Sequence, residues 1–526
     1  MPLDSLTNST ADAFRSAGGY VNDLMTPTVR LGVTGLSRAG KTVFITSLVR
    51  NLIVGGRLPF FQPHADGRIL RAFLEPQPDD AVPRFDYERH LATLAADPPD
   101  WPAGTRRISE LRITIEYEPT SYLRRLLGPA RLHVDIVDYP GEWLTDLALI
   151  AQPFADWAAE ALQLARSRIG HAGAPDALPA SRAFIAFHDD LTAPPVPNPA
   201  APDETVAAPD AEQTALEGAR LFTAYLAEAR IADGGIATLS PGRFLMPGDL
   251  EGSPLLTFFP LSPLPLAQSQ TAGGGDTQTR PTLPSPGYAK LEALLQRRYE
   301  SYKSHVVGPF FRNHFSRIDR QIVLVDVLGA MNGGQRAIAD LERALEGVLK
   351  AFRPGQNSWL SSWLSRRVDH LLFAATKADH LHHVSHDRLE ALLRLMTDRA
   401  ITRATSAGAE VGVMALSALR ATREAEARHK GEQLDCIVGT PLPGETIDGR
   451  VFDGKTEAAV FPGDLPADPK QALEGLASGT SDLNDMAVIR FRPPRLPLLA
   501  RDGQPAAMPH IRLDRVMQFL LGDKFR

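Results

Sequence analysis

The sequence predicts an α/β protein with a mostly parallel sheet and helices on both faces. A glycine-rich loop at residues 35–42 stands between an apolar, strand-like run and a stretch with helical spacing. Two nearly continuous apolar runs, Gln321–Leu328 and Val368–Ala375, alternate with helical stretches, as buried parallel strands do. Another apolar run ends in an acidic residue, Asp138. Because open α/β sheets bind ligands at the carboxyl ends of their strands, we expect the functional site in these loops.

The glycine-rich loop is a complete phosphate-loop motif, G-x-x-x-x-G-K-[ST], within VRLGVTGLSRAGKTVFITS. Glycine lets backbone N–H groups approach phosphate oxygens closely, and the following helix adds its positive end. We expect Lys41 to reach the β- and γ-phosphates and the Thr42 hydroxyl to bind Mg²⁺. A chance glycine turn before a helix is the alternative. The residues expected to contact the nucleotide here are Gly35, Ser37, Arg38, Ala39, Gly40, Lys41, Thr42 and Val43.

Length and composition narrow the class of protein. A chain of 526 residues exceeds one ordinary core and suggests two or three domains, or one domain with insertions. The net charge of −6 gives no reason to expect a nucleic-acid-binding surface. The single cysteine, Cys436, excludes an intramolecular disulfide and fits a reducing compartment. No apolar run is long enough to cross a bilayer and the start lacks a signal-peptide pattern, so we expect a cytoplasmic protein.

Changes of composition divide the chain into six predicted segments. Residues 192–211 and 268–287 have the composition of flexible inserts, and short runs separated by Gly, Pro and Asp follow residue 419. For the first segment a packed amphipathic helix is expected, with peripheral membrane contact as the alternative. The segments are an N-terminal helix at 1–28, the first part of the nucleotide-binding domain at 29–143, a helical insertion with flexible loops at 144–315, the second part of that domain at 316–420, a β-rich subdomain at 421–500 and a C-terminal helix at 501–526.

The pattern also predicts individual elements. Residues 111–117 and 132–137 read as strands, either of one hairpin or as neighbours in one sheet, and 411–418 as a later strand. Helices are predicted at 146–164, 211–231, 337–352, 387–400 and 510–521.

The second candidate motif is Asp138-Tyr139-Pro140-Gly141. An acidic residue at the end of an apolar strand is where a carboxylate holds Mg²⁺ through a water in phosphate-loop enzymes. The turn that follows would let the Gly141 N–H meet a γ-phosphate. The same tetrapeptide also forms ordinary β-turns, and only its position after a phosphate loop favours function.

The third candidate motif, Thr376-Lys377-Ala378-Asp379, indicates which base is bound. A carboxylate at the end of a late strand can accept the N1–H and N2–H groups of guanine, and adenine would leave it unpaired. We expect Asp379 to select guanine and the stem of Lys377 to lie along the base. Ser417-Ala418, at the next strand end, would offer a backbone N–H to guanine O6. The alternative is a solvated turn.

The four motifs in this order resemble the signature set of Ras-like, translation-factor-class GTPases. More specifically, the chain resembles the bacterial YcjX family of stress-associated P-loop GTPases, through GLSRAGKTVFITSL, WPAGT, DYPGEWL, PGRFLMPGDL, FFPL, LVDVLGAMNGG, FAATKADHL and LDRVMQFLLGDK. These stretches span nearly the whole chain. The resemblance implies a P-loop NTPase G domain with large helical and loop insertions and a small β-rich C-terminal excursion, which binds GTP or GDP with Mg²⁺.

Two positions depart from the Ras-like pattern, and the assignment of catalytic groups depends on them. Thr376 replaces the usual Asn, and Glu142 stands where a glutamine would orient the attacking water. Glu142 is therefore a candidate slow catalyst, a salt-bridge partner or a helix N-terminal residue. Thr105 is our candidate for completing the Mg²⁺ shell, and Arg106–Arg107 or Arg38 for stabilising charge. The predicted catalytic residues are Lys41, Glu142 and Thr105, and the predicted Mg²⁺ ligands are Thr42, Thr105 and Asp138.

The sequence thus predicts a Mg²⁺-dependent GTPase that acts as a nucleotide-dependent switch, slow without an unidentified activating protein. An ATPase or kinase on the same scaffold is one alternative. A binding module stabilised by nucleotide, without turnover, is another.

Overall fold

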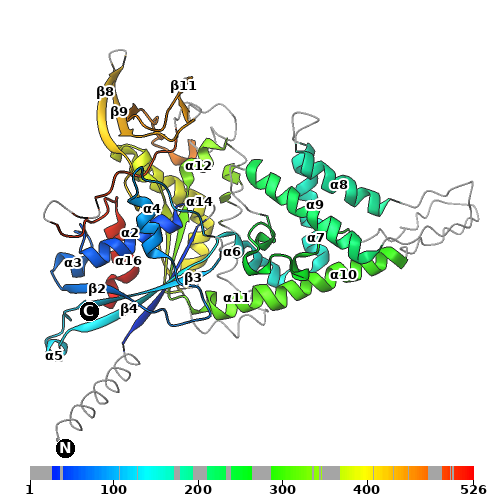
Figure 1. The fold of residues 1–526 in the computed structure, drawn as a ribbon, viewed down its shortest axis with the longest axis horizontal. Helices are drawn as coiled ribbons and strands as arrows, with labels where there is room; N and C mark the ends of the chain where they lie inside the picture. Colours follow the sequence, from blue (N-terminus) through cyan, green and yellow to red (C-terminus); the bar gives the residue numbers. More distant parts are fainter. Residues whose placement is uncertain are drawn as a thin grey trace, which may run out of the picture.

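The computed structural model describes residues 26–526 except for 36–38, 106, 127, 171–177, 194–209, 233–238, 263–285, 335–336, 340, 343–344, 346–367, 407, 430–431, 448, 472–487, 498 and 500–502. A seven-stranded sheet in the order β2-β3-β4-β1-β5-β6-β7 lies at its centre (Figure 1). Strands β4, β1, β5, β6 and β7 run parallel, and β3 is antiparallel to both of its neighbours. The predicted α/β fold with a mostly parallel sheet is confirmed.

The strands of the sheet are short and largely buried. They are β1 Thr28–Gly35, β2 Ile69–Glu75, β3 Ser109–Tyr117, β4 Ala130–Asp138, β5 Arg320–Val325, β6 His370–Ala375 and β7 Glu410–Ala415. Every residue of β5 is buried, as expected of a central parallel strand with both faces covered.

Helices cover both faces of the sheet. On one face, α2 (Lys41–Val54) and α16 (Leu513–Leu521) share a buried apolar cluster with β1, β3 and β4. On the other face, α14 (His386–Ser406) packs in a second cluster with β5 and β6. Shorter helices are α3 Gln62–Ala65, α4 Tyr87–Leu94, α5 Tyr122–Arg125 and α12 Val327–Asn332. Among the described residues, no helix combines the length and the apolar character needed to span a bilayer.

A helical region between the short helix α6 (Glu142–Leu147) and β5, which we call the insertion, extends away from the sheet (Figure 1). Its core is aromatic: the rings of Trp157 and Tyr299 stack with centroids 5.0 Å apart, and Phe222 and Phe258 meet Trp157 edge-on. A π-helical turn at Lys303–Val307 joins its last two helices. The helices of the insertion are α7 Phe154–Gly170, α8 Pro179–Thr192, α9 Ala211–Ala232, α10 Pro286–Tyr302 and α11 Gly308–Asn313.

A β-rich region after β7, which we call the excursion, carries small antiparallel sheets. Strand β9 pairs with both β8 and β12, and β10 pairs with β11. Its own core consists of Ile437, Phe452, Ala458, Val460, Ile489 and Phe491. The strands are β8 Arg423–His429, β9 Glu432–Gly439, β10 Thr446–Ile447, β11 Arg450–Val451 and β12 Ala458–Val460.

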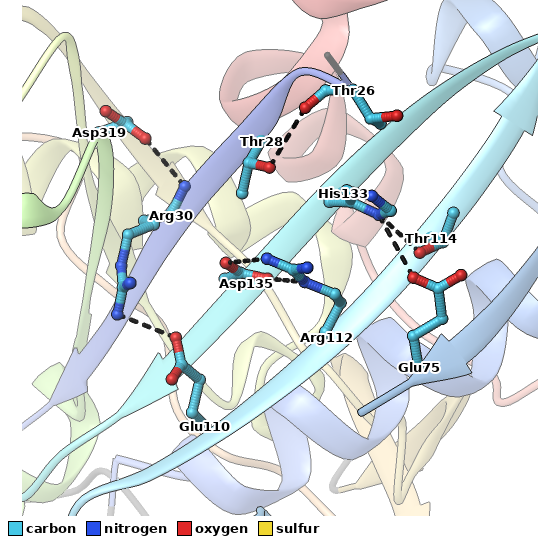
Figure 2. A network of polar contacts seen from close by, with 10 residues as sticks. All are labelled: Thr26, Thr28, Arg30, Glu75, Glu110, Arg112, Thr114, His133, Asp135 and Asp319. Atoms are coloured by element: carbon cyan, nitrogen blue, oxygen red, sulfur yellow. Dashed lines mark hydrogen bonds and ion pairs between the residues drawn. The ribbon is translucent and has the colours of Figure 1, made fainter. Parts of the chain in front are cut away.

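Charged side chains cross one face of the sheet in a row (Figure 2). Arg112 of β3 binds both carboxylate oxygens of Asp135 on β4, at 2.7 and 2.9 Å, and Arg30 of β1 reaches Glu110 at 2.9 Å. Glu110 and Asp135 are nearly inaccessible to solvent. A slip of one residue would turn these side chains to the opposite face, so the pairs help to fix the strand register.

The predicted strands at 111–117 and 132–137 are β3 and β4, which pair antiparallel as a hairpin and are also neighbours in the seven-stranded sheet. The single helix predicted at 146–164 is wrong, because α6 ends at Leu147 and α7 begins at Phe154. Pro153 lacks the N–H that a continuous helix would need there. The helix predicted at 1–28 and most of the one at 337–352 lie outside the described residues.

Candidate functional site

The phosphate loop joins the carboxyl end of β1 to α2. Gly40 precedes α2 with φ of 82°, a left-handed conformation that side chains disfavour. A Cβ at Gly35 would lie 2.8 Å from the carbonyl oxygen of Leu324 on β5, so this position also requires glycine. The Lys41 ammonium donates to the Gly35 carbonyl oxygen at 3.1 Å. At the described ends of the loop, the sequence thus places the glycines and the lysine that phosphate binding needs.

Asp138 ends β4 with its carboxylate buried. The Thr105 hydroxyl donates to Oδ2 of Asp138 at 2.7 Å, whereas Oδ1 has no hydrogen-bond partner among the described residues. Burial raises the pKa of Asp138 to about 6, although the Lys41 charge and the Thr105 hydrogen bond oppose the shift. A buried carboxylate oxygen without a partner, beside a hydroxyl, fits a hard cation that takes oxygen ligands. Thr42, buried at the start of α2, adds a second hydroxyl, so these three residues could hold Mg²⁺.

The residues after Asp138 are covered by the insertion. Gly141 precedes α6, and the Glu142 side chain that follows is only 2% exposed. Arg230, in the last turn of α9, lies with Nη2 at 3.3 Å from the Glu142 Oε1. A Cβ on Gly242 would lie 2.2 Å from the Glu142 carbonyl oxygen, so the insertion packs directly on this turn. Of the three roles predicted for Glu142, the structure therefore shows two: an ion-pair partner of Arg230 and the N-terminal residue of α6.

The carboxylate predicted to select the base is fixed by the start of the excursion. Asp379 is 3% exposed and its Oδ2 accepts the Ala421 N–H at 2.8 Å. The Thr422 hydroxyl donates to the carbonyl oxygen of Asp379. A carboxylate can accept hydrogen bonds from several donors. The bond from the Ala421 N–H therefore orients the Asp379 carboxylate and leaves it able to accept further hydrogen bonds.

The rest of the loop is braced against β5. The Thr376 hydroxyl donates to the Val325 carbonyl oxygen at 3.3 Å, so the departure from asparagine retains a bracing contact. Lys377 has φ of 61°, and its ammonium pairs with Asp326. These contacts fix Thr376 against β5 and the Lys377 ammonium on Asp326.

Ser417 and Ala418 follow β7. The Ser417 N–H donates to the Ile511 carbonyl oxygen at 3.1 Å, and its hydroxyl donates to that of Leu419 at 3.0 Å. Because the Ser417 N–H is engaged, the N–H predicted to face guanine O6 would come from Ala418.

One cavity of about 480 Å³ brings the motifs together. It is lined by the start of α2, by Thr105, by the Thr376–Asp379 loop, which we call the base loop, and by the residues that follow β7. Gly35, Asp138, Gly141 and Glu142 do not line it, and Ser37, Arg38 and Arg106 lie outside the described residues. The predicted residues that line it are Ala39, Gly40, Lys41, Thr42, Val43, Thr105, Thr376, Lys377, Asp379, Ser417 and Ala418.

Sequence reasoning missed several residues of this cavity. Arg230 and Met246 come from the insertion, and Arg490 and Phe491 come from the excursion. Trp101 lies just before Thr105, and its indole N–H donates to the Phe491 carbonyl oxygen at 2.7 Å. Trp101 belongs to the WPAGT stretch and Met246 to the PGRFLMPGDL stretch already singled out, whereas the other three have no local pattern that marks them.

A strand–phosphate loop–helix unit in the middle of a mostly parallel sheet defines the chain as a P-loop α/β protein. The model of the YcjX-like family, DUF463, matches residues 29–525, so the chain belongs to that family. The chain is 34% identical to the Ras-like GTPase YcjX of Escherichia coli K12 over 502 residues, which cover 95% of this chain and 96% of that protein. It is also 34% identical to the Ras-like GTPase YcjX of Shewanella oneidensis over 513 residues, 94% of each.

Proposed function

We propose that the protein binds guanine nucleotides and hydrolyses GTP to GDP with Mg²⁺. The observation that carries the proposal is the single cavity shared by the phosphate loop, Thr105, the Asp379 loop and the Ser417-Ala418 strand end. The naming of two full-length relatives as Ras-like GTPases supports it.

The chain's own residues would act by holding and orienting the nucleotide. Lys41 would exchange its contact with the Gly35 carbonyl for the β- and γ-phosphates, because a phosphate oxygen is a stronger acceptor for an ammonium. Bound Mg²⁺ would supply neutralisation of the charge that develops on the phosphates. Thr42, Thr105 and Asp138 would hold it. Glu142 stays a candidate for orienting the attacking water.

The switch that we propose follows from where Thr105 lies. The Thr105 hydroxyl is bonded to Asp138, and the preceding Trp101 is tied to the excursion through the Phe491 carbonyl oxygen. Binding of a γ-phosphate would draw Thr105 and Gly141 toward the nucleotide, and hydrolysis would release them. A role in bacterial stress response is implied only by the resemblance to the family.

The test is competition for bound fluorescent GDP by GTP, ATP and xanthosine triphosphate, with wild type and Asp379→Asn. The asparagine oxygen can still accept the Ala421 N–H, so the loop is retained. We expect GTP and not ATP to compete with wild type. The variant should lose at least about 100-fold in GDP affinity and prefer xanthine nucleotides, since an unpaired base donor costs kilocalories.

Asp398→Asn, an exposed aspartate on α14, is the matched control and should change nothing. Equal competition by ATP, with no effect of Asp379→Asn, would mean a P-loop ATPase, a kinase or an unselective binder. GTP binding without release of phosphate would mean a module stabilised by nucleotide.

A further inference from the structure

Arg230 is a cavity residue to which the proposed function assigns no role. It lies in the last turn of α9, far along the chain from the phosphate loop, yet it lines the same cavity as Lys41, Thr42 and Thr105. Its side chain is 22% exposed and contacts Glu142, the residue that follows Gly141. A cation from the insertion therefore stands at the phosphate end of the cavity.

The position of Arg230 is fixed from two sides. The residues before it on α9, from Phe222 to Ala229, contribute buried side chains to the aromatic core of the insertion, so the end of the helix has little freedom. On the other side, Arg230 contacts the Glu142 turn, which is itself held against the insertion. There the Ser240 hydroxyl donates to the Thr145 carbonyl oxygen at 3.1 Å, and Gly242 packs against Glu142. The guanidinium is thus held where helix α9, the Glu142 turn and the cavity meet.

Two other arginines near the cavity are placed differently from Arg230. Arg243 of the insertion stacks on Trp143 at 3.2 Å from the ring centroid and does not line the cavity. Arg490 lines the cavity but is 63% exposed and pairs with Glu445 in the excursion. Its neighbour Phe491 contacts the ring of His380, next to the base loop, which places Arg490 nearer the base than the phosphates.

Phosphoryl transfer is accelerated by a cation placed beside the phosphates. As water attacks the γ-phosphorus and the bond to the β–γ bridging oxygen breaks, negative charge spreads over the γ-oxygens and the leaving GDP. The bond electrons go to GDP, and the proton of the attacking water ends on inorganic phosphate. A guanidinium stays charged at any relevant pH and donates from a planar fork that matches phosphate oxygens.

We propose that Arg230 stabilises this transition state from the insertion, and that Glu142 positions it. The proposal rests on the hydrolysis proposed above. Arg230 is then a catalytic residue supplied in cis, and Glu142, which touches its guanidinium, is a positioning residue. Because the two come from different segments, nucleotide turnover would depend on how the insertion is seated.

The experiment compares wild type, Arg230→Ala, Arg230→Lys and Arg220→Ala by single-turnover GTP hydrolysis and by GDP affinity. Arg220 is a matched control on the same helix, exposed and paired with Glu217. We expect Arg230→Ala to slow hydrolysis at least 100-fold while changing GDP affinity less than 3-fold, and Arg230→Lys to restore little. Arg220→Ala should match wild type.

A second readout is formation of the GDP–aluminium fluoride complex, a transition-state analogue. Wild type should form it and Arg230→Ala should not, whereas a merely structural arginine would leave it intact. Hydrolysis by Arg230→Ala at the wild-type rate overturns the role of Arg230 and leaves the GTPase proposal standing. Absence of any turnover or analogue complex in wild type overturns both.

The positioning role has its own test in Glu142→Gln and the double variant with Arg230→Ala. If Glu142 acts through Arg230, the single variant is slow and the double variant is no slower than Arg230→Ala alone. If the rate loss of the double variant equals the product of the two single losses, the two residues act independently. That result would overturn the positioning of Arg230 by Glu142.

Discussion

The insertion and the excursion both reach the nucleotide cavity, but they are attached by different chemistry. The insertion meets the segment after Asp138 through buried polar groups. Asp146, which is fully buried, accepts the Tyr302 hydroxyl at 2.5 Å and the Gly242 N–H at 2.6 Å. The excursion meets the base loop through two uncharged donors, the Ala421 N–H on the Asp379 carboxylate and the Thr422 hydroxyl on the Asp379 carbonyl oxygen.

This difference indicates what each region can sense. The charge of the buried Asp146 side chain depends on pH. Its contacts depend on the position of the Glu142 turn, which lies beside the part of the cavity that would hold the phosphates. A backbone N–H and a threonine hydroxyl, the donors that the excursion supplies to Asp379, carry no charge. The junction of the insertion is therefore suited to change with the nucleotide state, and that of the excursion to hold the base loop constant.

The largest expected effect comes from Asp146→Asn. Burial raises the pKa of Asp146 to about 6, even though Tyr302, the Gly242 N–H and Arg243 all favour the charged form. The folded pKa lies above the unfolded value, so this carboxyl contributes stability below its unfolded pKa that is lost as pH rises through about 6. Across the whole titration the loss is about 3 kcal/mol, most of it between pH 4 and 8.

The asparagine does not titrate, so the unfolding free energy of the variant relative to wild type should rise over that interval. Thermal midpoints of both proteins across pH 4–8 measure it. If the thermal midpoints of the two proteins change with pH in parallel, Asp146 does not titrate in the folded protein. The inference that the junction of the insertion is sensitive to pH would then be wrong.

Gly242→Ala tests whether the junction of the insertion tolerates any added volume. The new Cβ would lie 2.2 Å from the Glu142 carbonyl oxygen, and because this is backbone, the two segments must move apart. We expect a loss of about 1–3 kcal/mol in stability and slower GTP hydrolysis. Gly170→Ala, where a Cβ meets nothing within 4 Å, should leave both unchanged. Equal effects of the two substitutions would contradict the close packing on Glu142.

The smallest expected effect is at the excursion. Trp101→Phe keeps a large ring but removes the N–H that donates to the Phe491 carbonyl oxygen at 2.7 Å. One lost hydrogen bond costs about 1 kcal/mol. Hydrogen exchange of residues 488–492 should become faster, with little change in GDP affinity. An unchanged exchange rate would show that Trp101 does not anchor the excursion, and Tyr122→Phe, at an exposed tyrosine, is the neutral control.

Several elements could be predicted because their signals are local. The strand before Gly35, the loop and α2 are contiguous, and β5 and β6 are nearly continuous apolar runs of the length and β-branched content typical of buried parallel strands. Strand β2 was missed since its residues have mixed exposure at the sheet edge and no clean alternation. Helix α8 was missed although Pro179 stands at its first turn, which is a recognised start signal.

The sequence by itself determined the mostly parallel sheet, the phosphate loop and the order of the motifs at its strand ends. Each of these depends on neighbours within a few residues, on a glycine at φ of 82° or on the period of apolar side chains. Only the tertiary structure decided that Arg230 meets Glu142, and that Trp101 binds the Phe491 carbonyl. Such contacts depend on how helices dock after long connections, and docking is set by side-chain packing that leaves no periodic trace in the sequence.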